Sequence, residues 1–365
     1  MQPAQTRGNT GEPRVLAWGI STGGLIGVDI TSATVKLLEL VHQGDRFRIE
    51  SWAVQPLAEG AVVERRIRDM ESVVVALGRA LEQARPRARR AAVAIPSSAA
   101  ITKVLSLPRG MSDDDIETRI ALESDRHIPF PFNEVAFDFH RLGVSARHAD
   151  QENVLLVACR RTDAQLLTDA LERVGLKLMA VDVESFAMER ACRQLMLQTD
   201  PEGGACCAVI DIGATMTAFH IVHEGRIVHS RDSNIGGRQL TDETRQHYRL
   251  TFEEAGLAKK RGDLPDYEAK LLGPFRNGLV QQIMRLLRLY YTTAGAREID
   301  RIVLGGGTSL LPGLKEQLAR DSRLPVVGAN PFDSMPLNGA IDRAALTRDA
   351  PAMLTACGLA MRVAL

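Results

Sequence analysis

The pattern of apolar and polar positions repeats itself in two parts of the chain. Residues 25–36 and residues 208–217 each read as a buried apolar strand with an aspartate near its end, a turn of small residues and the start of a second strand. The aspartates are Asp29 and Asp211, and in both copies a third strand follows another tight turn. The repetition predicts one α/β unit that occurs twice, in two lobes.

The two predicted hairpins share a chemistry. A turn of small residues exposes backbone N–H groups at close range, which suits a phosphate, and a neighbouring carboxylate suits the Mg²⁺ that accompanies phosphate. One such hairpin is weak support, because many turns contain small residues for conformational reasons alone. Two of them facing each other across a cleft would form a phosphate clamp.

The rest of the pattern divides the chain into segments. Apolar positions recur along one stripe of residues 62–85 and predict a single helix. Residues 101–178 read as strand, helix, strand, strand and helix, which we interpret as an inserted α/β subdomain. The predicted division is a disordered leader at residues 1–24, a first lobe at 25–100 and 179–205, the inserted subdomain at 101–178, a second lobe at 206–345, and a C-terminal helix at 346–365 that closes the first lobe.

Two glycine-rich turns mark further positions near the expected cleft. Gly236 and Gly237 precede a predicted helix, whose N-terminus suits a phosphate or a ribose. A second turn follows an apolar strand, where successive glycines let the backbone pass close to a flat ligand such as adenine. The residues of this second turn are Gly305, Gly306, Gly307 and Thr308.

Four charged residues, two on a predicted helix and two at the end of a predicted strand, complete the candidate set. Glu254 and Lys259 lie on a short capped helix and would face a ribose or a base edge. Asp182 and Glu184 lie where a first-lobe strand approaches the cleft, and a carboxylate there would position an attacking water. Capping of the helix that follows is an equally good interpretation of either acid.

Composition excludes several classes of protein. The 365 residues include 45 basic and 45 acidic side chains and only 4% aromatic residues, which argues against a nucleic-acid binder. The five cysteines lack zinc-ligand spacing and indicate buried thiols in a reducing compartment. No apolar run approaches the roughly 18 residues of a membrane span. These features predict a soluble cytoplasmic protein.

The motifs together resemble the five signature regions of the superfamily of actin, sugar kinases and heat-shock chaperones. More closely, the chain is similar to the PilM family of type IV pilus assembly proteins over residues 25–362. The stretches that carry this resemblance are residues 94–97, 182–187, 235–237, 253–259 and 350–359. The resemblance implies an actin-like two-lobed α/β fold of duplicated ribonuclease-H-like subdomains, with an inserted subdomain like that of FtsA.

The resemblance also implies a ligand, which is ATP with Mg²⁺ bound between the lobes. Asp29 and Asp211 would hold the metal through water. The phosphates would contact Thr31, Ser32, Thr34, Lys36, Gly213, Ala214 and Thr215, and the nucleoside would contact Gly306, Gly307, Glu254 and Lys259, with Gly236, Gly237, Gly305 and Thr308 beside them. Thr31 departs from the superfamily, where many members have glycine, and it narrows its turn.

A function follows from the resemblance. The family would act as a cytoplasmic scaffold at the inner membrane, in pilus assembly and twitching motility, and would associate with the membrane only through partners. It would dock the N-terminal tail of the membrane protein PilN in a groove between the first subdomain and the inserted one, and contact other components of the pilus machine. Self-association stays open, and we expect no nucleic-acid partner.

Two alternatives belong to other functional classes. A small-molecule kinase or an active ATPase needs a base near the reacting atoms, and only Asp182 and Glu184 offer one. Because no residue of the sequence reads as an arginine finger, we expect at most slow hydrolysis. An FtsA-like division protein would need a C-terminal amphipathic membrane helix, which the sequence does not contain.

Overall fold

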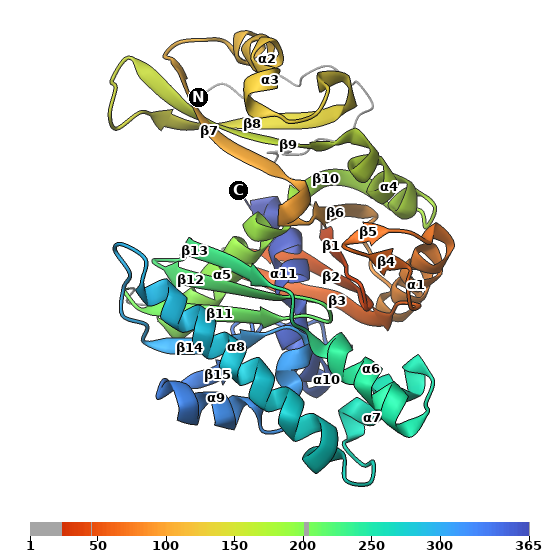
Figure 1. Ribbon diagram of the computed structural model, residues 1–365. Coiled ribbons are helices and arrows are strands. Elements are labelled where there is room, and N and C mark those ends of the chain that lie inside the picture. Colours follow the sequence, from red (N-terminus) through yellow and green to blue (C-terminus); the bar gives the residue numbers. More distant parts are fainter. Residues whose placement is uncertain (1–23, 45, 201–203, 365) are drawn as a thin grey trace.

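The first lobe is built on a five-stranded sheet in the order β10-β6-β1-β2-β3 (Figure 1). The computed structural model describes residues 24–44, 46–200 and 204–364, so the expected leader lies almost entirely outside the described residues. β1 pairs antiparallel with β2 and parallel with β6. The strands are β1 (Leu25–Ile30), β2 (Thr34–Gln43), β3 (Arg46–Pro56), β6 (Arg90–Ile95) and β10 (Lys177–Val183).

The second lobe repeats the first. Its sheet has the order β13-β12-β11-β14-β15, in which β11 again pairs antiparallel with the next strand and parallel with β14. The strands are β11 (Cys206–Ile212), β12 (Thr217–His223), β13 (Arg226–Ser233), β14 (Arg301–Gly305) and β15 (Val326–Gly328). The duplication predicted from the two aspartate hairpins is therefore confirmed.

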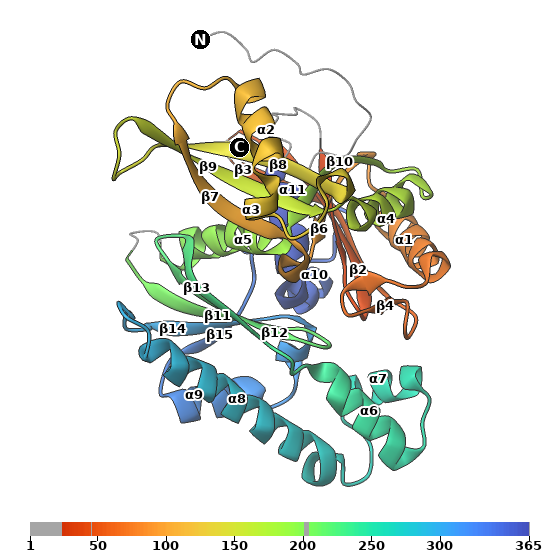
Figure 2. The same cartoon turned by 45° about the horizontal axis from the view of Figure 1, so that its top comes forward.

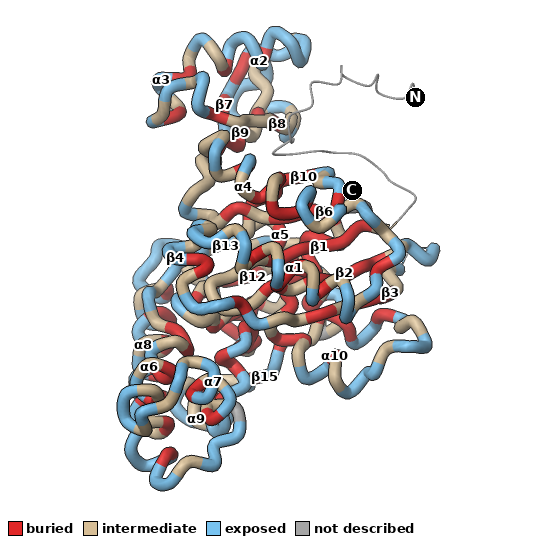
Figure 3. Tube along the Cα trace, turned by 90° about the vertical axis from the view of Figure 1, so that its right-hand side faces the viewer, coloured by how far each residue is buried: buried red, intermediate tan, exposed pale blue. Residues whose placement is uncertain are grey.

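Helices cover both sheets. The first lobe carries α1 (Met70–Ala84), α4 (Arg161–Glu172) and α5 (Glu184–Thr199). The second lobe carries α6 (Gly237–Tyr248), α7 (Phe252–Arg261), α8 (Gly273–Tyr291) and α9 (Leu314–Ser322). α10 (Arg343–Asp349) buries Leu346 in a core that it shares with β2 and β3 of the first lobe. The last helix, α11 (Leu354–Ala360), packs against α5 and β1, as expected for a segment that closes the first lobe. Buried residues follow the strands of the first sheet in Figure 3.

The inserted subdomain is a three-stranded sheet that stands at the end of the first lobe away from α8 and α9 (Figures 1 and 2). Its elements are β7 (Ile101–Pro108), α2 (Asp113–Leu122), α3 (Ser124–His127), β8 (Val135–Val144) and β9 (Gln151–Arg160). Ser112 and Asp115 form a capping box at the start of α2.

The helix α4 differs from the sequence-based division. We assigned it to the inserted subdomain, but its apolar residues Leu167, Ala170 and Leu171 belong to the core of the first lobe. It occupies the place that α9 has in the second lobe, before the last strand of the sheet. Packing therefore ends the inserted unit near Arg160.

The predicted helix over residues 62–85 is also shorter than expected. Residues 62–67 form a hairpin of β4 (Val62–Val63) and β5 (Arg66–Ile67), and α1 begins only after Asp69, which accepts a hydrogen bond from the Ser72 N–H at 3.1 Å. The turn residues Glu64 and Arg65 have φ values of 51° and 63°, in the left-handed region that no helix interior uses.

Two further expectations concern the whole chain. All five cysteines are free and buried, as predicted. Among the described residues, no helix combines the length and the apolar character that a membrane crossing requires.

Candidate functional site

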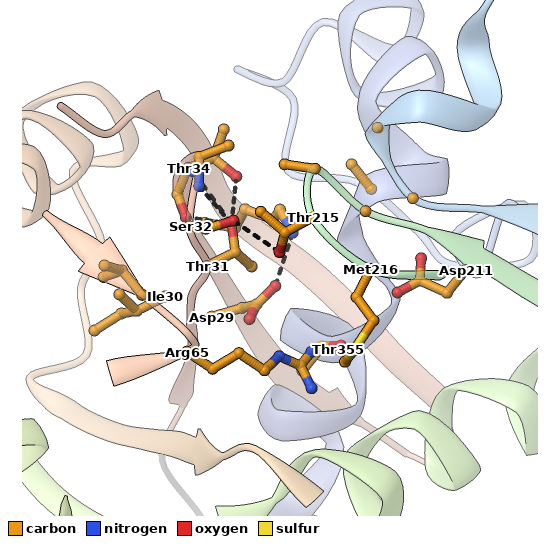
Figure 4. Close-up of a pocket in the computed structure, with 18 of the residues that line it drawn as sticks. Asp29, Ile30, Thr31, Ser32, Thr34, Arg65, Asp211, Thr215, Met216 and Thr355 are labelled. Atoms are coloured by element: carbon orange, nitrogen blue, oxygen red, sulfur yellow. Dashed lines mark hydrogen bonds and ion pairs between the residues drawn. The ribbon is translucent and has the colours of Figure 1, made fainter. Parts of the chain in front are cut away.

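The tips of the two aspartate hairpins meet between the lobes (Figure 4). Ser32 Oγ lies 3.4 Å from Thr215 Oγ1, although the two residues belong to different lobes. Thr31, the departure from the superfamily, closes its own turn, because its hydroxyl donates to the Thr34 carbonyl at 3.0 Å and accepts from the Thr34 N–H at 3.2 Å. The two hairpin tips therefore face each other, as the repeated pattern predicts.

A cavity of about 630 Å³ opens beside the hairpin tips, within the size range of small-molecule sites. It brings together most of the predicted residues from both lobes. Those that line it are Asp29, Thr31, Ser32, Thr34, Lys36, Glu184, Asp211, Gly213, Ala214, Thr215, Lys259, Gly306, Gly307 and Thr308.

Charges are concentrated at one end of the cavity. Lys36 is the register partner of Asp29 on the neighbouring strand, and its Nζ lies 2.8 Å from Asp29 Oδ2. Burial alone would lower the pKa of Lys36, but the charges of Asp29, Asp211 and Glu184 outweigh it and raise the pKa. Lys36 therefore stays charged and offers a fixed cation to an anionic ligand.

The two other carboxyl groups at this end have raised pKa values. Burial raises the pKa of Asp211 to about 6, with a further contribution from Asp29 and opposition from Lys36 and Arg65. Burial likewise raises the pKa of Glu184 to about 7, against the attraction of Arg65. Strongly shifted acids in a cleft are typical of functional sites.

Arg65 is a cavity residue that the sequence analysis did not identify. It lies in the turn of the β4–β5 hairpin and extends into the pocket toward Asp211 (Figure 4), where its Nη2 is 2.5 Å from Glu184 Oε1. The expected helix over residues 62–85 would have directed this side chain elsewhere. The residues around Arg65 gave no contrary signal, because Val63, Ile67 and Met70 fall at the spacing of a helical stripe.

The glycines act in two ways. Gly306 and Gly307 line the cavity, whereas Gly236, Gly237 and Gly305 do not, and they serve instead to bring backbone segments together. A Cβ on Gly236 would lie 2.5 Å from the Ala214 carbonyl oxygen, one on Gly237 would lie 2.3 Å from Thr308 Oγ1, and one on Gly305 would lie 2.6 Å from Leu354 Cδ1. These three glycines allow the segments that form the cavity wall to pack closely, although they do not line the cavity themselves.

Lys259 and Thr308 support the same corner of the second lobe. Thr308 Oγ1 donates to the Gly213 carbonyl at 2.8 Å, and Lys259 Nζ donates to the Gly237 carbonyl at 3.0 Å. The glycine loop, the second hairpin turn and α6 are therefore joined by hydrogen bonds around the cavity wall.

Asp182 does not reach the cavity, which corrects its expected catalytic role. Its side chain is fully buried and pairs with Arg190 on α5 and with Arg362, whose Nη1 lies 2.6 Å away. Burial works against its charge, but these two arginines keep the pKa of Asp182 below its ordinary value. The residue joins β10 and α5 to the end of the described chain.

Glu254 is also outside the cavity. Its carboxylate accepts hydrogen bonds from the N–H and the hydroxyl of Thr251, at 2.8 and 2.9 Å, and closes a capping box at the start of α7. This role was readable from the Thr-x-x-Glu spacing. Of the two residues assigned to a nucleoside on this helix, only Lys259 lines the cavity.

The residues present suit magnesium and a phosphate ester. No group of three or more metal-ligating side chains occurs in the described part of the chain, but Mg²⁺ in phosphate sites needs only one or two carboxylates. Asp29 and Asp211 both line the cavity beside exposed backbone turns and a buried lysine. The donor set therefore fits the group that the sequence predicts.

The duplicated sheets and the cleft between them define an actin-like fold. A family model described as type IV pilus assembly protein PilM matches residues 27–364, and the chain belongs to this family. The fold is shared with a solved structure described as a PilM–PilN type IV pilus biogenesis complex, at 24% identity and a TM-score of 0.76, covering 94% of this chain and 100% of that one.

Two further solved structures show more distant likeness. The ethanolamine utilization protein EutJ from Carboxydothermus hydrogenoformans is 16% identical, with a TM-score of 0.54 and coverage of 94% of this chain and 92% of that one. MreB5 of Spiroplasma citri, bound to AMPPNP, is 15% identical with a TM-score of 0.46, covering 92% and 95%.

Proposed function

We propose that this type IV pilus assembly protein is an ATP-binding scaffold whose nucleotide state sets the strength with which it docks a membrane partner's tail. The observation that carries the proposal is the meeting of two aspartate hairpins over one cavity, with Ser32 and Thr215 3.4 Å apart. A ligand held by both hairpins bridges the lobes, so its binding favours the closed arrangement of the lobes.

The cavity supports the nucleotide part of the proposal. Asp29 and Asp211 would hold Mg²⁺, the two hairpin turns and Lys36 would receive the phosphates, and Gly306, Gly307 and Lys259 would receive the nucleoside. When bound, the metal neutralises phosphate charge. The chain's own residues orient the ligand, because their turns are already fixed by the Thr31 and Thr308 hydrogen bonds.

The similarity to a PilM–PilN complex supports the partner part of the proposal. The inserted subdomain exposes apolar side chains that its own core does not use, among them Val104 on β7, Leu122 on α2 and Leu142 on β8. We propose that a groove beside this subdomain receives the cytoplasmic N-terminal segment of a PilN-like protein. The partner then holds the protein at the cytoplasmic face of the inner membrane.

A physical path connects the two sites. The strand β9 of the inserted subdomain leads directly into α4, and Leu166 and Leu167 of α4 line the nucleotide cavity. A shift of α4 upon lobe closure changes the base of the inserted subdomain. Coupling of this kind is reciprocal, so the tail also changes the affinity for the nucleotide.

Calorimetric titration tests the coupling. A synthetic peptide of the PilN-like tail is titrated into the full chain with and without saturating Mg-ATP. We expect the peptide affinity to change by about fivefold or more, which is the lower end of typical allosteric coupling. If the peptide binds with the same affinity in the presence and absence of bound Mg-ATP, the coupling is contradicted, although docking of the tail is still supported.

An excision variant separates the two binding sites. Ile101 and Ala158 are register partners on β7 and β9, so a short turn can replace residues 102–157 without stretching the chain. This variant retains α4 and should bind Mg-ATP but not the peptide. If the intact protein binds ATP and ignores the peptide, the enzyme alternative gains weight, and Glu184 is the first residue to replace.

A further inference from the structure

We propose that Arg65 reads the terminal phosphate of the bound nucleotide by exchanging its ion pair with Glu184 for one with that phosphate. The inference rests on the proposed ATP site and adds a regulatory residue to it. The β4–β5 hairpin would distinguish a triphosphate from a diphosphate. Neither the two aspartate hairpins nor the glycine loop of residues 305–308 has this role in the proposed site.

The position of Arg65 is set by an unusual turn. Both turn residues of the hairpin, Glu64 and Arg65, have positive φ, although neither is the glycine or asparagine that such turns favour. Non-glycine residues held in this region often occur at functional sites, where the surrounding structure maintains them. Here the turn directs the Arg65 side chain inward, into the cavity (Figure 4).

The surroundings of Arg65 suit a phosphate. Its guanidinium is only part-buried, with 29% of the side chain exposed, and its partner Glu184 is at 2.5 Å. Guanidinium groups bind phosphates through two parallel hydrogen bonds, which makes a phosphate a strong competitor for the carboxylate. Lys36 differs, since it is fixed on a sheet strand beside Asp29.

In Figure 4, Arg65 lies on the far side of Asp29 from the hairpin tips at Ser32 and Thr215, and we assign the terminal phosphate to this end of the cavity. Gly307, Leu310 and Lys259 line the wall that the second lobe supplies, where the nucleoside is proposed to lie. Arg65 comes from the first lobe, on the side of Asp29 away from Ser32 and Thr215 (Figure 4). A polyphosphate whose nucleoside lies on the second-lobe wall would therefore present its terminal phosphate to Arg65.

The same hairpin contacts the route to the inserted subdomain. The neighbouring residue, Arg66, faces Asp163 on the first turn of α4, with 4.0 Å between Nη2 and Oδ2. Exchange of partners by Arg65 therefore acts on a hairpin that faces the helix following β9. In this way the presence of a third phosphate is communicated toward the partner site.

Nucleotide titrations test the inference without any measurement of turnover. Mg-ATP and Mg-ADP are titrated separately into the full chain and into the variants Arg65→Gln and Arg65→Lys. Arg65→Gln should weaken ATP binding about tenfold to a hundredfold, the range expected for a lost charge-assisted hydrogen bond, and leave ADP binding within about twofold. The ATP affinity of Arg65→Lys should lie between those of the native protein and Arg65→Gln, because lysine keeps the positive charge but lacks the planar guanidinium that donates two parallel hydrogen bonds.

A matched control removes the same charge from the neighbouring surface. Arg68 is exposed, lies three residues further on and does not line the cavity, so Arg68→Gln should change neither affinity. A cycle with Glu184→Gln adds a second readout. Glu184→Gln alone removes the carboxylate that competes for Arg65, so it should bind ATP over ADP with a greater preference than the native protein. In a protein that already carries Arg65→Gln, adding Glu184→Gln should leave the preference for ATP over ADP unchanged.

The outcomes separate this inference from the function on which it rests. Equal losses of ATP and ADP affinity in Arg65→Gln, or no loss of either, would overturn the role of Arg65. A native chain that binds neither nucleotide would overturn the ATP site itself. If Arg65→Gln fails to fold, Arg65→Lys and Glu184→Gln decide the question. The inference requires the preference for ATP over ADP to fall in Arg65→Lys and to rise in Glu184→Gln.

Discussion

Asp211 holds a charge that the protein alone accommodates poorly. Burial raises its pKa to about 6 from an ordinary value of 3.8, so its ionised form is disfavoured relative to the unfolded chain. A raised carboxyl pKa means that the folded state binds more protons between these two pH values. The ionised Asp211 side chain therefore lowers the free energy of unfolding at pH values above about 6, and this penalty is progressively lost as the pH falls toward 3.8.

The first prediction follows from this sign. Asp211→Asn should increase the free energy of unfolding by about 1–3 kcal/mol at pH 8, and the gain should disappear near pH 4. The same variant should lose Mg-dependent ATP binding, because one of the two proposed metal-holding carboxylates is gone. Denaturant unfolding at both pH values and ATP titration at pH 8 measure the two effects.

Asp263→Asn is the matched control, because Asp263 is exposed and lies in a loop outside the cavity. It should change neither property. A destabilised Asp211→Asn variant at pH 8 would show that the Asp211 charge is better compensated than its burial indicates, and retained tight binding of Mg-ATP would remove the residue from the metal site.

At the scale of elements, α11 approaches its neighbours at glycine contact points. A Cβ on Gly358 would lie 1.8 Å from the carbonyl oxygen of Ala187 on α5, and one on Gly27 in β1 would lie 2.1 Å from the Ala356 carbonyl oxygen. Both blocking atoms are backbone, so they can move only if a helix moves. The contact of α11 with the first lobe thus depends on the absence of two side-chain carbons.

The second prediction compares two glycines in helices. Gly358→Ala should lower the free energy of unfolding by at least about 2 kcal/mol, because overpacking against backbone forces α11 away from α5. Gly278→Ala on α8, where nothing lies within 4 Å of the added carbon, should raise it by up to about 1 kcal/mol. Denaturant unfolding of both variants provides the comparison, and equal effects would contradict the close approach of α11.

Elements also show what the sequence could predict. Strands with continuous apolar runs and a repeated order, such as those that carry Asp29 and Asp211, were placed correctly together with their pairing. The residues facing the cavity from these hairpins were found because a period-two strand and a turn of small residues fix where each side chain points.

The missed features have a common physical cause. β4 and β5 contain two residues each, too few for a period, and the apolar residues around them continued the stripe of α1. Asp182 and Glu184 were indistinguishable in sequence, because only packing shows that one faces two arginines and the other the cavity. α4 was misassigned because chain order does not reveal which core a helix joins.

At the scale of the whole molecule, ion pairs join the lobes outside the nucleotide cavity. Glu59, in the loop after β3, accepts from Arg238 Nη2 at 2.6 Å and lies 3.4 Å from Arg245 Nη1, both on α6 of the second lobe. Exposed pairs of this kind are weak and sensitive to salt. They bias the opening of the cleft without locking it.

The third prediction concerns this bias. Glu59→Gln should broaden the distribution of distances between spin labels on the two lobes toward longer values, and high salt should do the same to the native protein. Addition of Mg-ATP should restore the narrow distribution, because the ligand bridges both hairpins.

Asp242→Asn is the control for the arginines themselves. Asp242 pairs with Arg238 and Arg245 from within the same helix, so its removal alters their surroundings without breaking a contact across the cleft. Its distance distribution should remain that of the native protein. Identical distributions for Glu59→Gln and the native protein would show that the Glu59 ion pairs do not bias the opening of the cleft.

The packing of α11 has a consequence for how the protein is made. β1 leaves the ribosome early, but its glycine contact is with a helix at the other end of the described chain, and Leu38, Leu40 and Ile49 share a core with Met353 and Cys357. During synthesis these apolar side chains are therefore uncovered while most of the polypeptide is still being translated. Until α11 emerges, this uncovered apolar surface exposes the nascent chain to aggregation, a risk that follows from packing β1 and β2 against residues more than 300 positions later.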